Sequence, residues 1–309
     1  MLSYEKIVFI DKQQAEIQTD TIDETHIPAG HYLIKTLYSL VSAGTETACY
    51  KGQEAWFPLP GVPGYSCVGE VIGKADDVQA VDVGDMVFCR GKHAGVQLMP
   101  QDSLPIKVPG DVDLKYVPFT RMAAISISSL RISNIELGDD VLVIGLGLIG
   151  NFAAQLATLQ GANVLGMDLS DMRLAAAKEC GVAHTLNSSA GVDMAEAIHE
   201  TFGGRMPTTV IDATGVPKVI EQGLTYVEKG GQMILLGSPR GEYTGNVTNV
   251  LQHVHQFRYR VDLLGAHERV APRGITPYVK HSAQRNERIC LDLIAAGRLK
   301  TDNLLTKLL

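Results

Sequence analysis

The strongest constraint on the fold is the run Asp140–Gly150, which reads DVLVIGLGLIG. A short apolar run rich in β-branched residues predicts a buried strand, and the glycines after it predict a tight turn into a helix. Gly145 permits the turn, Gly147 lets the backbone approach a ligand, and Gly150 lets the helix pack on the strand. The N–H groups and the positive dipole end of such a helix attract an anion. The run therefore predicts a site for the pyrophosphate of a dinucleotide, and the first helical residues there are Leu148 and Ile149.

The residues that follow indicate which dinucleotide is bound. An apolar helical face ends near Gly161, and a second strand, 163–168, ends in Asp168. An acid about 20 residues after the glycines is typical of a ligand for the adenosine ribose hydroxyls. Its charge repels a 2′-phosphate, which favours NAD(H) over NADP(H). Arg173, a little further on, would instead bind a 2′-phosphate if the loop folded back.

Composition excludes several classes of function. The 309 residues suit two domains better than one, and the net charge of −7 comes with no basic patch for nucleic acid or anionic membrane. The N-terminus lacks the pattern of a secretory signal, and no apolar stretch reaches membrane-spanning length. The five cysteines are scattered, with no C-x-x-C pair. These features predict a cytoplasmic protein with free thiols.

The chain divides into three segments by pattern. Residues 1–117 alternate short β-type runs with Gly and Pro turns, which predicts an antiparallel, barrel-like domain. Residues 118–266 alternate helices with near-continuous apolar strands, which predicts a doubly wound parallel sheet and an α/β fold class. Residues 267–309 contain one amphipathic helix near 283–296. Thr214 and Gly237 fall at the carboxyl ends of two predicted strands, where parallel sheets bind ligands.

Five short motifs carry a resemblance to a known family. They are Ala43–Glu46 (AGTE), Pro63–Ser66 (PGYS), Val83–Val87 (VGDMV), Asp212–Gly215 (DATG) and Leu236–Gly237 (LG). In this order they resemble the medium-chain dehydrogenase/reductase family, which contains the zinc alcohol and polyol dehydrogenases. The resemblance implies a GroES-like catalytic domain over 1–117, a Rossmann domain over 118–266 and a return segment over 267–309. It also implies cofactor contacts by Thr214 and Gly237, and a homodimer or higher homo-oligomer. The chain ends earlier than is usual in the family, so a trimmed domain or an edge supplied by a partner subunit is expected.

The departures from that family concern its metal. Where zinc members carry three ligands, this chain has Ala43, Tyr65 and Arg121, and Ser66 replaces the acid of the second motif. Alanine has no donor atom, neutral tyrosine is a poor zinc ligand, and arginine carries a fixed positive charge. The four-cysteine lobe of the structural zinc is also missing. The sequence therefore predicts a zinc-independent member with no metal site.

Without zinc, other groups must polarise the substrate oxygen and move its proton. The resemblance places Thr45 at a proton-relay position. Tyr65 is predicted to hydrogen-bond the substrate oxygen, and Arg121 to lower the pKa of Tyr65 or to bind an anionic substrate group. Alternatives stay open: Tyr65 as packing in the vacated metal site, Arg121 paired with Glu46, and His93 as a structural hydrogen-bonding residue or a proton shuttle.

Three classes of function remain at this point. The first is an NAD(H)-dependent dehydrogenase that interconverts a secondary alcohol and a ketone on a small-molecule substrate. The second is a zinc-free NAD(P)H reductase of enones or quinones, which needs only modest polarisation of a carbonyl. The third is a non-catalytic dinucleotide-binding protein, because fold alone does not establish function.

Overall fold

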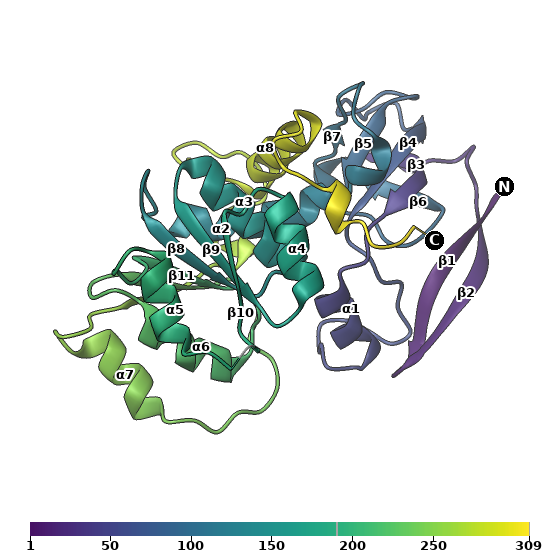
Figure 1. Ribbon diagram of the computed structural model, residues 1–309. Helices are drawn as coiled ribbons and strands as arrows, with labels where there is room; N and C mark the ends of the chain where they lie inside the picture. Colours follow the sequence, from purple (N-terminus) through teal and green to yellow (C-terminus); the bar gives the residue numbers. More distant parts are fainter. Residues whose placement is uncertain (190, 309) are drawn as a thin grey trace. The chain divides into compact units, whose positions relative to one another are not determined.

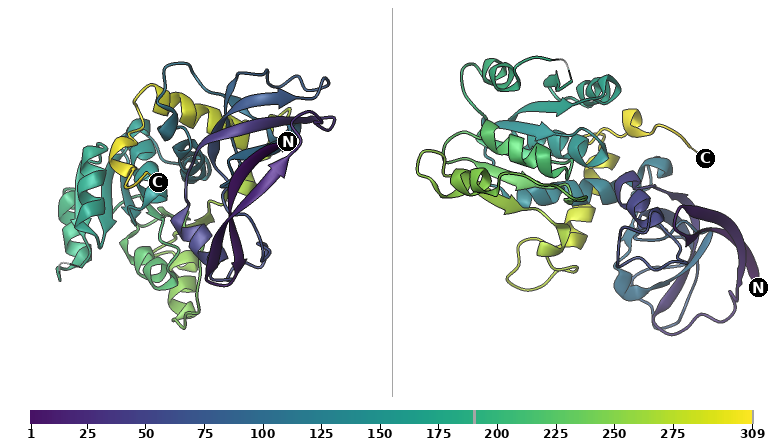
Figure 2. Two further views of the ribbon diagram at one scale, coloured as in Figure 1. Left: turned by 90° about the vertical axis from the view of Figure 1, so that its right-hand side faces the viewer. Right: turned by 90° about the horizontal axis from the view of Figure 1, so that it is seen from below.

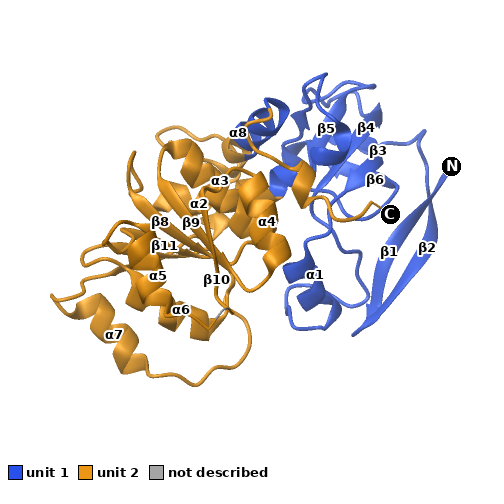
Figure 3. Cartoon of the chain, viewed as in Figure 1, with its two compact units in different colours: residues 1–121, 287–296 blue, residues 122–286, 297–309 orange. Residues whose placement is uncertain are grey.

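The computed structural model describes residues 1–189 and 191–308 and divides into two compact units (Figure 3). Unit 1 comprises residues 1–121 and 287–296, and unit 2 the described residues of 122–286 and 297–309. Of the segment 267–309, only residues 287–296 belong to unit 1. In the part of the chain that is described, no helix is both long and apolar enough to cross a membrane.

Unit 1 is built on antiparallel strands (Figure 1). Five strands form one sheet in the order β6-β3-β4-β5-β7, and β1 and β2 form a separate hairpin. Alternating residues such as Tyr32, Ile34 and Val71 face the core of this sheet. The α-helix α1 (Ala43–Tyr50) lies wholly within this unit. The strands are β1 (Leu2–Asp11), β2 (Gln14–Ile22), β3 (His31–Ser39), β4 (Cys67–Lys74), β5 (Met86–Cys89), β6 (Val96–Pro100) and β7 (Ile106–Lys107).

Unit 2 is a six-stranded parallel sheet in the order β10-β9-β8-β11-β12-β13. The strand order reverses between β8 and β11, which is the arrangement of a doubly wound sheet. The strands are β8 (Asp140–Ile144), β9 (Asn163–Asp168), β10 (His184–Asn187), β11 (Thr209–Asp212), β12 (Gln232–Leu235) and β13 (Asp262–Gly265). The helices are α2 (Phe119–Ile132), whose first turn lies in unit 1, α3 (Leu148–Gln160), α4 (Asp171–Glu179), α5 (Met194–Thr201), α6 (Pro217–Gly223), α7 (Val247–His255) and α8 (Ala283–Ala295), which runs into unit 1.

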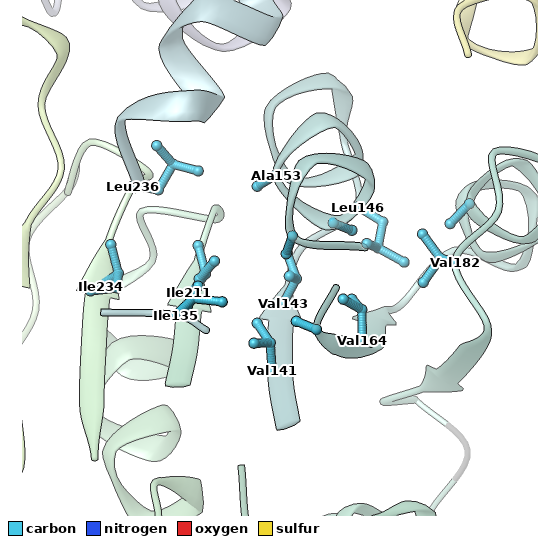
Figure 4. Close-up of a cluster of buried hydrophobic side chains, with 14 of the residues drawn as sticks. Ile135, Val141, Val143, Leu146, Ala153, Val164, Val182, Ile211, Ile234 and Leu236 are labelled. Atoms are coloured by element: carbon cyan, nitrogen blue, oxygen red, sulfur yellow. The ribbon is translucent and has the colours of Figure 1, made fainter. Parts of the chain in front are cut away.

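The parallel sheet is buried on both faces, which explains why its strands read as continuous apolar runs. In β8, Val141 and Val143 point into one core, whereas Leu142 and Ile144 point into the other. Figure 4 shows Val141 and Val143 among the side chains of the first core, close to Ile211. Helices lie on both sides of this sheet (Figure 2). The predicted α/β fold class follows directly from this two-sided burial.

Truncating the second core should destabilise the protein. Leu142 is 0% exposed, so Leu142→Ala removes buried apolar atoms and leaves a cavity. We expect the free energy of unfolding to fall by about 2–5 kcal/mol. Leu137→Ala is the matched control, because Leu137 is 85% exposed and its loss should cost less than about 0.5 kcal/mol. Urea denaturation followed by circular dichroism measures both, and equal losses for the two variants would contradict this packing.

Candidate functional site

The glycine turn after β8 leaves an open cradle at the start of α3. Gly145 has a φ of +89°, which favours glycine. A Cβ on Gly150 would overlap the carbonyl oxygen of Gly145, so the helix packs too closely for any side chain there. Gly147, the N-cap of α3, has no side-chain cap, and a Cβ built on it would meet nothing within 4 Å. The turn therefore presents free space next to the helix N–H groups of Leu148 and Ile149, which suits a dinucleotide pyrophosphate.

Asp168 shapes this turn from the end of β9. Its carboxylate accepts hydrogen bonds from the N–H of Leu146 at 2.7 Å and from the N–H of Ser170 at 2.9 Å. The guanidinium of Arg173 lies 3.5 Å from the same carboxylate. Sequence reasoning missed the bond to Leu146, because nothing in the pattern shows which backbone group a strand-end acid contacts. A carboxylate has about four acceptor positions, so Asp168 keeps capacity for ribose hydroxyls.

Residues after β11 and β12 meet the same turn. Asp212 is buried and accepts hydrogen bonds from the Thr214 hydroxyl at 2.6 Å and from the N–H of Gly215 at 3.0 Å. Burial raises the pKa of Asp212, and these hydrogen bonds oppose that rise. A Cβ on Gly145 would touch the methyl group of Thr214, and one on Gly237 would overlap the N–H of Gly215. Gly145, Thr214 and Gly237 thus lie together where the strand order reverses, which is where doubly wound sheets bind ligands.

A second polar cluster lies in unit 1 around Tyr65. The Tyr65 hydroxyl donates a hydrogen bond to Ser42, the N-cap of α1, and Thr45 is a further hydrogen-bond partner. The Ser42 side chain does not cap the helix. Instead, the carboxylate of Glu46 accepts the Ser42 N–H at 2.7 Å. The hydroxyl of Ser42 is therefore committed to Tyr65.

Arg121 lies beside the same ring. Its guanidinium carbon is 5.6 Å from the ring centroid of Tyr65, within the range of a cation–π contact. The structure therefore brings together the predicted catalytic residues Thr45, Tyr65 and Arg121.

The pKa of Tyr65 differs from the predicted direction. Burial raises it above 10.0, whereas the hydrogen bonds of Ser42 and Thr45 and the charge of Arg121 lower it by less. The charge of Arg121 lowers the pKa of Tyr65, as predicted, but desolvation of the phenolate raises that pKa by more. Tyr65 is consequently a neutral phenol at physiological pH, which makes it a hydrogen-bond and proton donor.

Glu46 and Arg121 do not pair with each other, although the sequence left that alternative open. Glu46 pairs with His93, with 2.8 Å between Oε2 and Nε2, and both side chains are buried. The other ring nitrogen of His93 lies 2.8 Å from the hydroxyl of Ser39. Arg121 pairs at 3.5 Å with Glu287 from α8. This geometry supports His93 as a structural hydrogen-bonding residue. His93 contacts the carboxylate of Glu46, and that carboxylate accepts the N–H of Ser42.

The resemblance assigns the positions of three zinc ligands to Ala43, Tyr65 and Arg121, none of which carries a thiolate, imidazole or carboxylate. Within residues 1–189 and 191–308, no group of three or more His, Cys, Asp or Glu side chains is placed to hold a metal ion. The side chains in direct contact with Tyr65 are the hydroxyls of Ser42 and Thr45 and the guanidinium of Arg121, whereas zinc prefers thiolate, imidazole and carboxylate ligands. His253 binds the carbonyl of Asn249 at 2.9 Å and stacks on Tyr259, which is a structural role.

Comparisons with known proteins agree with the fold and the reaction class. Residues 149–271 match the family model described as zinc-binding dehydrogenase. An uncharacterized zinc-type alcohol dehydrogenase-like protein of Haemophilus influenzae is 24% identical over 87% of this chain and 81% of its own length. D-xylulose reductase of Scheffersomyces stipitis is 31% identical over 48% of this chain and 41% of its own length.

The solved structures show the same architecture. A putative zinc-binding dehydrogenase of Sinorhizobium meliloti, bound to NADP, has a TM-score of 0.79 and 22% identity and covers 98% of this chain and 91% of that one. The fold class predicted from the sequence is confirmed. Together the comparisons support an oxidoreductase.

Gly147 and Gly150 should respond differently to substitution by alanine. Gly147→Ala fills the open space, so we expect NADH affinity to fall at least about tenfold, which is about 1.4 kcal/mol, with little change in unfolding temperature. Gly150→Ala forces a clash with Gly145, so its unfolding temperature should drop by several degrees. Isothermal titration and thermal denaturation separate the two effects. Unchanged NADH affinity in a folded Gly147→Ala protein would contradict a pyrophosphate site at this turn.

The raised pKa of Tyr65 predicts a specific alkaline instability. Above about pH 10 the unfolded chain loses the Tyr65 proton while the folded protein retains it, so the free energy of unfolding falls as pH rises. Tyr65→Phe removes this contribution, and its stability should fall less steeply than that of the wild type between about pH 9.5 and 11. Urea denaturation at several pH values measures this slope, with Tyr50→Phe as the control in the same unit. A slope in Tyr65→Phe equal to that of the wild type would show that burial does not raise this pKa.

Proposed function

We propose that this chain is a zinc-independent, NAD(H)-dependent oxidoreductase that interconverts a secondary alcohol and a ketone by hydride transfer. The observation that carries the proposal is the Tyr65 phenol, held by Ser42 and Thr45 beside Arg121 at positions where related enzymes have zinc ligands. The relatives support an alcohol as substrate, since they include a zinc-type alcohol dehydrogenase-like protein and a D-xylulose reductase. A hydroxyl cluster can polarise a carbonyl oxygen without a metal.

The cofactor supplies the hydride when it is bound, and the protein must manage the oxygen and its proton. In the direction of reduction, the carbonyl carbon receives the hydride and the Tyr65 hydroxyl gives its proton to the developing alkoxide. The hydroxyl groups of Ser42 and Thr45 can rotate and then donate to the phenolate oxygen that remains. Arg121 stabilises the same negative charge from beside the ring. In the direction of oxidation, the proton returns to Tyr65 along the same bonds.

Asp168 supports NAD(H) as the cofactor. Its buried carboxylate lies at the end of β9, and a 2′-phosphate placed against it would meet a like charge. Bound NAD(H) would be held by the turn residues Gly145, Gly147 and Gly150 and by the strand ends at Thr214 and Gly237.

One contact favours the second candidate, a zinc-free NADPH reductase of enones or quinones. Arg173 lies 3.5 Å from Asp168, half exposed, and its guanidinium could bind a 2′-phosphate if it turned away from the carboxylate. The Sinorhizobium meliloti structure, which holds NADP, agrees with this alternative. Hydride addition to a conjugated carbon would need only the hydrogen bond from Tyr65.

Turnover measured in excess chelator tests the proposal. The absorbance of the reduced nicotinamide is followed with NAD⁺ or NADP⁺ against secondary alcohols, and with NADH or NADPH against ketones, enones and quinones. We expect turnover of an alcohol or ketone with NAD(H), and a fall of about 10²- to 10⁴-fold in kcat for Tyr65→Phe, the range for losing a general acid.

Tyr50→Phe serves as the matched control, because it removes a phenol of the same unit that bonds only the carbonyl of Gln13 among the bonds described. Its turnover should match that of the wild type. Turnover by Tyr65→Phe at the wild-type rate would overturn the role of Tyr65. Activity with NADPH and enones alone would favour the second candidate.

A further inference from the structure

Two thiols face each other across neighbouring strands of unit 1. Cys67 opens β4, Cys89 closes β5, and the two residues are direct partners in the antiparallel register. Their sulfur atoms are 3.4 Å apart, and both side chains are buried, at 0% and 2% exposure. The cysteines are reduced in this structure.

The strand geometry permits a bond between these sulfurs. A disulfide needs Cα atoms about 4.4–6.8 Å apart, and facing residues of antiparallel strands lie about 4.5–5.5 Å apart. Packing leaves the Cys67 sulfur little other room, because a Cβ on Gly91 would overlap it. The amide of Gln97 lies 3.7 Å from the same sulfur. The free direction for Cys67 is therefore toward Cys89.

The surroundings give the two thiols different roles. Hydrogen bonds from the Cys89 thiol, the Gly91 N–H and Gln97 lower the pKa of Cys67 against the effect of burial. The thiolate is the reactive form, and the amide of Gln97 lies 3.7 Å from the Cys67 sulfur, which favours Cys67 as the nucleophile and Cys89 as the resolving thiol. Cys180 contrasts with Cys67, since burial raises the pKa of the Cys180 thiol to about 11.

Both thiols are buried, so a small oxidant reaches the pair only when the end of β5 opens locally. The pairing of β5 with β7 involves Val87 and Phe88 and stops before Cys89. Opening this strand end breaks few backbone bonds, and local opening is easiest where such bonds are few.

Both thiols are connected to the Tyr65 cluster through their neighbours in the sequence. Cys67 follows Ser66, whose hydroxyl donates to the carbonyl of Pro118 at 2.6 Å, and Ser66 follows Tyr65. Cys89 precedes Arg90, whose Nε donates to Glu287 at 2.7 Å, and Glu287 pairs with Arg121 beside the Tyr65 ring. A shift of Cys67 or Cys89 on forming a bond would therefore reach the cluster through Ser66 and through Arg90.

We propose that Cys67 and Cys89 form a redox-sensitive dithiol that hydrogen peroxide converts to a disulfide, and that this bond alters the Tyr65 site. The Cys67 thiolate attacks one peroxide oxygen, the O–O bond breaks, and the departing hydroxide takes a proton to become water. The Cys89 thiol then attacks the resulting sulfenic acid, an S–S bond forms, and a second water leaves. Two electrons pass from the two thiols to the peroxide. The effect on turnover rests on the proposed function, whereas the cross-link does not.

Peptide mapping of peroxide-treated, full-length protein tests the cross-link. After oxidation, blocking of free thiols and digestion, we expect one peptide pair joined through Cys67 and Cys89, and a fall from five free thiols to three. Dithiothreitol should restore all five. Cys180→Ser is the matched control and should form the cross-link as the wild type does, whereas Cys67→Ala and Cys89→Ala should not.

Hydrogen exchange measured by mass spectrometry tests the link to the Tyr65 site. Peptides that cover residues 61–68 and 86–93 should change their exchange on oxidation, and those of α4 in unit 2 should not. Oxidation of other cysteines with Cys67 and Cys89 left reduced would overturn the proposed dithiol. A complete cross-link with unchanged exchange at 61–68 would overturn its effect on Tyr65. Because these readouts need no substrate, their failure is distinguishable from a failure of the proposed function.

Discussion

The close approach of α3 to β8 is the constraint on which unit 2 depends. The contact leaves no room for a Cβ at Gly150, so the helix begins directly above the strand end. The same approach sets the turn of Gly145 against Thr214 and places the open space at Gly147. Asp168 then ties the turn to β9 through the N–H of Leu146. A strand, a helix end and an acid thus meet at the point where the strand order reverses, which is where doubly wound sheets bind ligands.

Unit 1 uses a different constraint, the need to satisfy buried polar groups. Glu46 cannot be buried without partners, and it has two, the N–H of Ser42 and the ring of His93. With its backbone held by Glu46, Ser42 directs its hydroxyl to Tyr65 instead of to the helix. Desolvation keeps Tyr65 neutral, and Arg121 lies close enough to stabilise the charged form when a proton leaves. The cluster is consistent with a donor that gives up a proton and regains it.

The sequence predicted features formed by neighbouring residues better than contacts between residues far apart in the chain. The glycine turn and the apolar strand 140–144 are written within eleven consecutive residues, and both were predicted from the pattern alone. The meeting of Thr45, Tyr65 and Arg121 came from the resemblance, because these residues are far apart in the chain. The partner of Arg121, Glu287, comes from a helix 166 residues away, and no local pattern signals it.

Two further features depended on surroundings that a sequence does not display. The direction of the Tyr65 pKa is a balance between burial and charge, and burial can be known only after folding. A pair of Glu46 with Arg121 was one alternative that the sequence left open, yet the carboxylate of Glu46 contacts His93 instead. Spacing predicts which backbone segments meet. It does not predict which of several charged side chains reaches a given carboxylate.

We propose that hydroxyl groups around Tyr65 polarise the substrate oxygen, as zinc does in related enzymes. Elemental analysis of protein produced with ample zinc, combined with turnover of the same sample, tests this most directly. The account predicts full turnover with far less than one zinc per chain, unchanged after chelation. One zinc per chain whose removal abolishes turnover and whose return restores it would contradict the account.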